Sequence, residues 1–229
     1  MACPAYCSPR TARRPDREVR DTSVTDTLGG MSDTWMAAYA EKSENERSWT
    51  QPLPSDSLAV IDSIGLDTSA AVIDVGGGAS YLVDNLTARG FSDVTLLDLS
   101  PAALEESRAR NGGSVTYVAH DVTTWMPPRT YALWHDRAVF HFLVDDERQE
   151  AYLRTVLAGT APGSHLVLAT FAPDGPESCS GLPVRRWSAD GLEARFGGHF
   201  DPVARSRSEH TTPWGSVQPF TFVHLVRRG

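Results

Sequence analysis

Three glycines follow the first clear apolar run of the chain, and an acidic residue precedes them. Residues 72–80 read VIDVGGGAS. Glycines directly after a buried strand let the backbone approach a ligand at a helix N-terminus. Counted from Gly76, the dinucleotide pattern G-x-G-x-x-G fails, because Tyr81 occupies the third glycine position. The carboxylate of Asp74 would repel a pyrophosphate and attract a cationic ligand.

Two more acids stand where the next two predicted strands end. Asp98 closes the second strand, twenty residues after Gly78, and could accept hydrogen bonds from both hydroxyls of a ribose. Asp121 follows the third strand and could meet an adenine amino group. Simpler roles remain open: Asp98 could only cap a helix, Asp121 could be a solvated loop acid, and Asp74 could only hold the glycine turn.

Strands and helices alternate from residue 70 onward, which predicts βαβ units and a mostly parallel sheet. The apolar runs predict strands at 71–75, 93–97, 115–119, 131–135 and 166–170. Between them, helices are predicted at 79–89, from Ser100-Pro101 onward, and at 146–157. Proline suits the first turn of a helix, since its missing N–H costs nothing there.

The C-terminal part has a different pattern. A loop is predicted at 172–183, a short helix around 188–196, and strands at 202–208 and 220–226. No helix fits between the last two strands, so they should pair antiparallel at one edge. The predicted fold is α/β: a doubly wound, mostly parallel seven-stranded sheet with a C-terminal antiparallel hairpin.

In these segments the chain resembles the class I S-adenosylmethionine-dependent methyltransferases, over roughly residues 70–229. The resemblance rests on VIDVGGG, LLDLS, AHDV and WHDRAVFHF at the ends of the first four strands. It implies a Rossmann-like methyltransferase fold and S-adenosyl-L-methionine as the cofactor. The cofactor-binding residues that it implies are Asp74, Gly76, Gly77, Gly78, Asp98, Leu99, Asp121 and Val122. Ser80 departs from members that carry a third glycine there.

The end of the fourth strand faces the transferred methyl group in this family, which draws attention to WHDR at 134–137. Asp136 and His135 are the expected catalytic residues, although a general base is needed only if the acceptor arrives protonated. Arg137 could bind an anionic acceptor or pair with a helix acid. His141 could contact the substrate or be a core histidine, since it lies in the apolar run VFHFL.

Segments before the sheet should complete the substrate side. Helical patterns run through Trp35 and Tyr39 and across 55–64, where Ser55 is placed as an N-cap. Because N-terminal helices of the family commonly form a lid over the cofactor, Tyr39 and Trp49 are expected to contact the substrate. Tryptophans at such positions are otherwise plain core packing.

Length and composition limit the number of domains, the classes of partner and the cellular location that can be expected. A chain of 229 residues suits one domain, expected at 31–229 with a helical lid at 31–66 and a disordered tail at 1–30. A net charge of −8 disfavours nucleic acid, and no apolar run approaches the roughly 20 residues that span a membrane. Three cysteines make no even disulfide framework, so a cytoplasmic location is expected. No metal is expected.

The leading hypothesis is methyl transfer from S-adenosylmethionine to a small molecule, by a monomer or homodimer. A protein-lysine methyltransferase is the first alternative, on the Asp136-Arg137 pair and the acidic surface. That pair usually precedes glycine in the lysine and thiopurine enzymes, whereas Ala138 follows it here. A nicotinamide-dependent oxidoreductase and a non-catalytic cofactor-binding protein are the further alternatives.

Overall fold

The computed structural model describes residues 46–229. Several sequence predictions fall on the preceding residues and lie outside this part of the chain. They are the disordered tail at 1–30, the first part of the lid at 31–66, and the contact of Tyr39 with the substrate.

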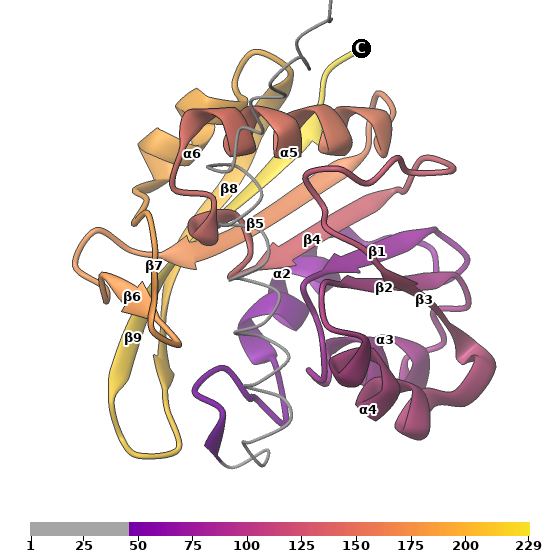
Figure 1. Ribbon diagram of the computed structural model, residues 1–229. Coiled ribbons are helices and arrows are strands. Elements are labelled where there is room, and N and C mark those ends of the chain that lie inside the picture. Colours follow the sequence, from indigo (N-terminus) through magenta and orange to yellow (C-terminus); the bar gives the residue numbers. More distant parts are fainter. Residues whose placement is uncertain (1–45) are drawn as a thin grey trace, which may run out of the picture.

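A seven-stranded sheet forms the centre of the protein (Figure 1). Its strands are β1 (Val72–Val75), β2 (Val94–Asp98), β3 (Val115–Ala119), β4 (Leu133–Arg137), β5 (His165–Phe171), β8 (Phe200–Thr211) and β9 (Val217–Arg227). They lie in the order β3-β2-β1-β4-β5-β9-β8. The pairs among β1 to β5 are parallel, whereas β9 runs antiparallel to both β5 and β8. The fold class predicted from the sequence is confirmed.

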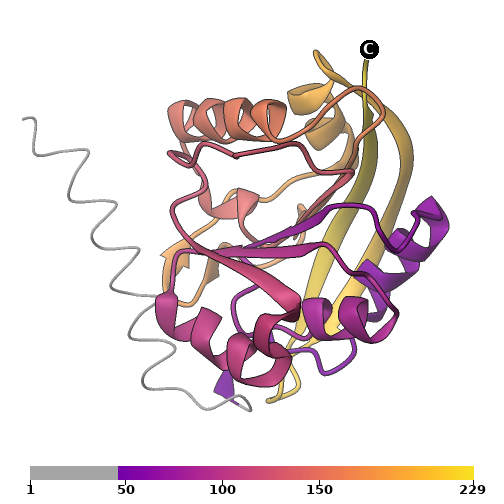
Figure 2. The same ribbon diagram turned by 90° about the vertical axis from the view of Figure 1, so that its right-hand side faces the viewer.

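Helices cover both faces of the sheet (Figure 2). They are α2 (Ser55–Ile64), α3 (Leu82–Ala88), α4 (Pro101–Asn111), α5 (Asp146–Ala158) and α6 (Ala189–Phe196), with 3-10 turns η2 (Gly112–Ser114) and η3 (Phe140–Phe142). One apolar cluster includes Tyr152 of α5 and Phe196 of α6. A second includes Ile61, Leu86 and Leu104, from α2, α3 and α4. Among the described helices, none is long and apolar enough to cross a membrane.

Helix starts follow local sequence signals. The Ser100 hydroxyl accepts from the Ala103 backbone N–H at 3.3 Å, and Pro101 occupies the first turn of α4, as predicted. Asp145 caps α5 in the same way through the Arg148 backbone N–H at 2.8 Å. The prediction for Ser55 is wrong. Pro54 is the N-cap residue of α2, without a side-chain cap, and Ser55 is already helical.

Other boundaries differ from the sequence predictions. β4 begins two residues later than expected, at Leu133, because that residue pairs with Val72 of β1, whereas the Tyr131 backbone N–H bonds to Gly159 outside the ladder. α3 begins at Leu82, after a turn in which the Ser80 N–H bonds to the Gly77 carbonyl. The loop predicted at 172–183 contains a small antiparallel hairpin, β6 (Ser178–Cys179) and β7 (Leu182–Pro183).

The strand order reverses at β1, which pairs with β2 on one side and with β4 on the other. In doubly wound sheets, ligands bind outside the carboxyl ends of the strands at this reversal. The fold therefore places the ends of β1, β2 and β4 around one crevice.

Candidate active site

A pocket lies at the carboxyl ends of β1, β2 and β4 and brings together residues far apart in the sequence. Its wall on the sheet side includes Asp74, Gly76, Gly77, Asp98, Leu99, Asp121 and Val122. Seven of the eight cofactor-binding residues predicted from the sequence therefore line one cavity. Gly78 does not line it; its backbone N–H instead bonds to the Asp98 carboxylate.

The glycine turn after β1 leaves no room for side chains. Gly76 has φ +68°, and a Cβ there would stand 1.9 Å from the Val139 side chain. A Cβ on Gly77 would stand 2.1 Å from Oδ2 of Asp74. The Gly76 N–H donates to the Leu97 carbonyl at 2.6 Å, which ties the turn to β2. Glycine is therefore required at both positions by the close packing of Val139 and Asp74 against the turn.

Asp74 lies beneath this turn with only 2% of its surface exposed. Its Oδ1 is 2.7 Å from Nδ1 of His135. Its Oδ2 is buried and has no hydrogen-bond partner within residues 46–229. A buried carboxylate oxygen without a partner is costly, and a ligand ammonium would satisfy it. This orphaned oxygen fits the ammonium end of the implied cofactor.

His135 is held at both ring nitrogens. Besides the contact with Asp74, its Nε2 lies 2.9 Å from Oγ of Ser57 on α2. Ser57 also lines the pocket and is 1% exposed. Since both nitrogens already have partners, His135 cannot directly take a proton from an acceptor as predicted. Ser57 carries no local signal in the sequence that would predict this contact.

Asp98 ends β2 with 8% of its surface exposed. Its Oδ1 accepts from the Ser100 backbone N–H at 2.7 Å. Burial raises the pKa of this carboxyl to about 7, and the nearby charge of Asp74 adds to the effect, against backbone hydrogen bonds that lower it. The residue lines the pocket, and its carboxylate also holds the start of α4. Its contact with ribose hydroxyls stays a prediction.

Asp121 follows β3 and lines the pocket together with Val122 and His120. Its Oδ1 accepts from the backbone N–H and hydroxyl of Thr123, at 2.8 and 2.7 Å. One carboxylate oxygen thus holds the local turn. His120 was not predicted from the sequence, although it immediately precedes a residue that was.

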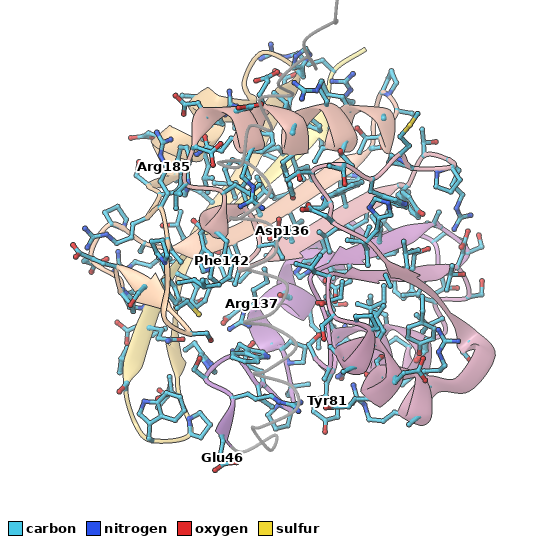
Figure 3. All side chains as sticks on the ribbon, viewed as in Figure 1. Glu46, Tyr81, Asp136, Arg137, Phe142 and Arg185 are labelled. Carbon is cyan, nitrogen blue, oxygen red and sulfur yellow. The ribbon has the colours of Figure 1, made fainter. Side chains whose placement is uncertain are left out.

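The prediction that Asp136 lines the pocket is wrong. Neighbouring strand residues point to opposite faces, so Asp136 lies on the α5 side of β4 (Figure 3). It is fully buried and accepts from the Tyr152 hydroxyl at 2.6 Å and from the backbone N–H groups of Val139 at 2.9 Å and Phe140 at 3.2 Å. Burial raises the pKa of its carboxyl to about 6. Asp136 is therefore a structural residue.

Arg137 lies on the pocket side of β4 and lines the cavity (Figure 3). Its guanidinium stacks over the Phe220 ring at 4.7 Å and donates to the Trp49 carbonyl at 3.4 Å. Within residues 46–229 it forms no ion pair with a carboxylate. Burial lowers the pKa of this arginine to about 10. Of the two roles considered for Arg137, pairing with a helix acid is not realised as an ion pair, although the charge of Asp56 on α2 acts on the guanidinium. Binding of an anionic acceptor stays a prediction.

His141 belongs to the core, which corrects its assignment to the substrate side. It is fully buried beside the Phe142 and Phe171 rings, and it does not line the pocket. Its Nδ1 accepts from the Phe171 backbone N–H at 3.3 Å. Burial lowers the pKa of its imidazole to about 3, so the ring is neutral.

Residues 46–54, here called the strap, form the opposite wall, where Trp49, Gln51 and Pro54 line the pocket. One end is tied to α4, where Arg47 donates to both oxygens of Glu106 at 2.6 and 2.7 Å. The other is tied to β8 through His210, which bonds to the Ser48 carbonyl and, at 3.1 Å, to Gln51.

Two further pocket residues carry no sequence signal, Arg148 on α5 and Cys179 on β6. Both reach the cavity only through the packing of distant elements. Across residues 46–229, no cluster of three histidine, cysteine or acidic side chains could hold a metal ion.

Comparison with known proteins agrees with this geometry. A family model described as a methyltransferase domain matches residues 72–163. Trans-aconitate 2-methyltransferases of Methylobacterium radiotolerans and Rhizobium rhizogenes are 30% and 32% identical over 175 and 156 residues. These alignments cover 76% and 63% of this chain and 62% and 58% of the relatives. The chain thus spans about six-tenths of the length of these curated relatives.

Solved structures show the same architecture. The Burkholderia thailandensis 1,6-didemethyltoxoflavin-N1-methyltransferase, with S-adenosylhomocysteine bound, superposes with a TM-score of 0.68 at 16% identity, covering 97% of this chain and 95% of that one. The N-methyltransferase NodS of Bradyrhizobium japonicum gives 0.66 at 13%, covering 86% and 99%. At these identities the likeness concerns the fold.

Proposed function

We propose that this chain is a class I S-adenosylmethionine-dependent methyltransferase, which the matching methyltransferase family model supports, and that it transfers the cofactor's methyl group to a carboxylate oxygen of a small organic acid. The relatives named for trans-aconitate act, by that name, on such an acid. The observation that carries the proposal is Arg137, a partly buried guanidinium that lines the pocket and forms no ion pair with a carboxylate among the described residues.

The cofactor side of the proposal uses the acids at the strand ends. Oδ2 of Asp74 would hold the ammonium, Asp98 the ribose hydroxyls, and Asp121 with Val122 the adenine. The glycine turn would let the backbone approach the amino-acid end. S-adenosylmethionine supplies an electrophilic methyl on a sulfonium whose leaving group is a neutral thioether. The protein contributes proximity and orientation, worth about 7–11 kcal/mol in well-aligned reactions.

A carboxylate acceptor fits the rest of the pocket. At neutral pH it is already ionised, so no general base is required. Both ring nitrogens of His135 are already hydrogen-bonded within the protein, and Asp136 is buried on the opposite face of β4. The carboxylate oxygen would form the new bond to the methyl carbon, and the electron pair of the broken C–S bond would stay on sulfur. Arg137 would orient the acceptor and then bind the neutral ester less well.

The other functions considered have weaker support. A lysine acceptor would bring an ammonium next to the Arg137 guanidinium, which opposes its binding. A nicotinamide cofactor would place its pyrophosphate against Asp74 and lacks the third glycine. A non-catalytic binding protein would bind the cofactor without turnover. We further propose a cytoplasmic location, on the odd number of cysteines, and a monomer or homodimer.

Radiolabelled methyl transfer tests the proposal against small carboxylic acids that include trans-aconitate, with amines, phenols and a lysine-rich protein as competitor classes. We expect esters of one or more acids. Arg137→Gln should raise the KM for the acid about 10- to 150-fold, the loss of a charged hydrogen bond of about 1.5–3 kcal/mol. Arg185→Gln, an arginine that pairs with exposed Asp146, is the matched control. Methylation of amines alone, or an unchanged KM in the Arg137 variant, would refute a carboxylate acceptor.

A further inference from the structure

We propose that Ser57 and His135 are positioning residues that hold Asp74 ready for the ammonium of the cofactor. The three side chains form a continuous chain, Ser57 Oγ to His135 Nε2 at 2.9 Å and His135 Nδ1 to Asp74 Oδ1 at 2.7 Å. They come from α2, β4 and β1 and are 1%, 2% and 2% exposed. The proposal rests on the proposed function, because it concerns how that cofactor is held.

The direction of the hydrogen bonds follows from the side-chain chemistry. A carboxylate only accepts, so Nδ1 of His135 carries the proton shared with Asp74. In the tautomer with its proton on Nδ1, the ring accepts at Nε2 from the hydroxyl of Ser57. Each atom in the chain has one role, which fixes the rotamers of both His135 and Asp74.

Asp74 needs such support because its surroundings are otherwise unfavourable. It lies under the glycine turn, where Oδ2 has no partner within residues 46–229. It also lies close enough to Asp98 for its charge to raise the pKa of that carboxyl. With Oδ1 taken by His135, the orphaned Oδ2 is the one oxygen left for a cation. A carboxylate without this partner could rotate and present neither oxygen correctly.

The effect should be confined to one end of the ligand. His135 and Ser57 act through Asp74, which is assigned to the ammonium, whereas Asp98 and Asp121 are assigned to the adenosine. S-adenosylhomocysteine carries both ends. 5′-Methylthioadenosine carries the same adenosine and sulfur but no amino-acid group. Comparing the two ligands therefore separates positioning of Asp74 from general damage to the pocket.

The test measures both dissociation constants by calorimetry for His135→Leu, His135→Asn and Ser57→Ala. The leucine variant removes both hydrogen bonds, and the asparagine amide can still donate to Asp74. We expect His135→Leu to weaken S-adenosylhomocysteine about tenfold or more, Ser57→Ala about threefold, and His135→Asn to recover part of the loss. Binding of 5′-methylthioadenosine should stay within about twofold for all three.

Ser107→Ala, which removes a buried serine of α4 outside the pocket, should leave both ligands unchanged. In a double variant, Asp74→Asn with Ser57→Ala should be no weaker than Asp74→Asn alone. Equal losses for both ligands, or unchanged S-adenosylhomocysteine binding in Ser57→Ala and His135→Leu, would overturn the proposal. If the wild-type protein binds neither ligand, the proposed function itself fails.

Discussion

The proposed contact between Asp98 and the cofactor ribose can be tested through its pH dependence. The carboxyl has to be ionised to accept hydrogen bonds from two ribose hydroxyls. Burial raises its pKa from 3.8 to about 7, with the charge of Asp74 adding to the effect. With that pKa, about nine-tenths of the carboxyl is ionised at pH 8 and about one-eleventh at pH 6. We therefore expect S-adenosylhomocysteine to bind about tenfold more weakly at pH 6 than at pH 8, a loss of about 1.4 kcal/mol.

Asp98→Asn separates this effect from every other titration in the pocket. The variant should bind more weakly at pH 8 by about 1.5–3 kcal/mol, the range for hydrogen bonds to a charged group. It should lose most of the pH dependence, so the two proteins converge at low pH. The assay is calorimetry from pH 5.5 to 8.5 with both proteins. A wild-type affinity that is flat between pH 6 and 8, or an equal slope in Asp98→Asn, would refute the reasoning.

The free energy of unfolding of the ligand-free protein should change with pH in the opposite direction to the ligand affinity. A folded-state pKa above the unfolded value means that the native state binds the extra proton. The contribution of Asp98 protonation to the free energy of unfolding is complete below about pH 4 and is lost as the pH rises through about 7. The free energy of unfolding of the wild type, relative to Asp98→Asn, should therefore fall over this window.

Two further substitutions test the core beside the pocket. Asp136→Ala should cost about 3–5 kcal/mol of unfolding free energy, because it leaves the Tyr152 hydroxyl and two backbone N–H groups buried without an acceptor, while turnover per folded molecule is kept; a stable variant without turnover would contradict this. Ala138→Gly should stabilise the protein by up to about 1 kcal/mol in urea unfolding, because Ala138 has φ +74° and glycine relieves that strain at a smaller entropic cost. Ala172→Gly, at a buried alanine with ordinary φ, is the control and should destabilise; equal effects would contradict the strain argument.

The cofactor half of the site could be predicted because its signals are local. Asp74 and the glycines follow directly on an apolar run, and Asp98 ends the next one. The two sides of β4 could not be distinguished in the same way. Strands of a parallel sheet are buried on both faces, so Trp134 to Arg137 show no alternation that would reveal which side chain faces the pocket.

Contacts between segments far apart in the chain could also not be predicted from the sequence. Ser57 meets His135 across 78 positions of sequence, through the packing of α2 on the sheet. Nothing in residues 55–64 distinguishes this serine from an ordinary first-turn residue. His141 is the opposite case, because the apolar run around it already offered a core position as the alternative to substrate contact, and the structure places it in the core.

The strap has a consequence for how such a catalyst could diversify. The donor half of the cavity is built by strand ends whose glycines and acids tolerate little change. The facing half is contributed by a separate stretch, anchored at Arg47 and at His210. Exchanging Trp49, which lies beside those two anchors, would alter the acceptor space while leaving the residues at the strand ends unchanged. Under the proposed function, acceptor selectivity and cofactor binding are thus carried on different stretches of chain, and a new acceptor would require changes in only one of them.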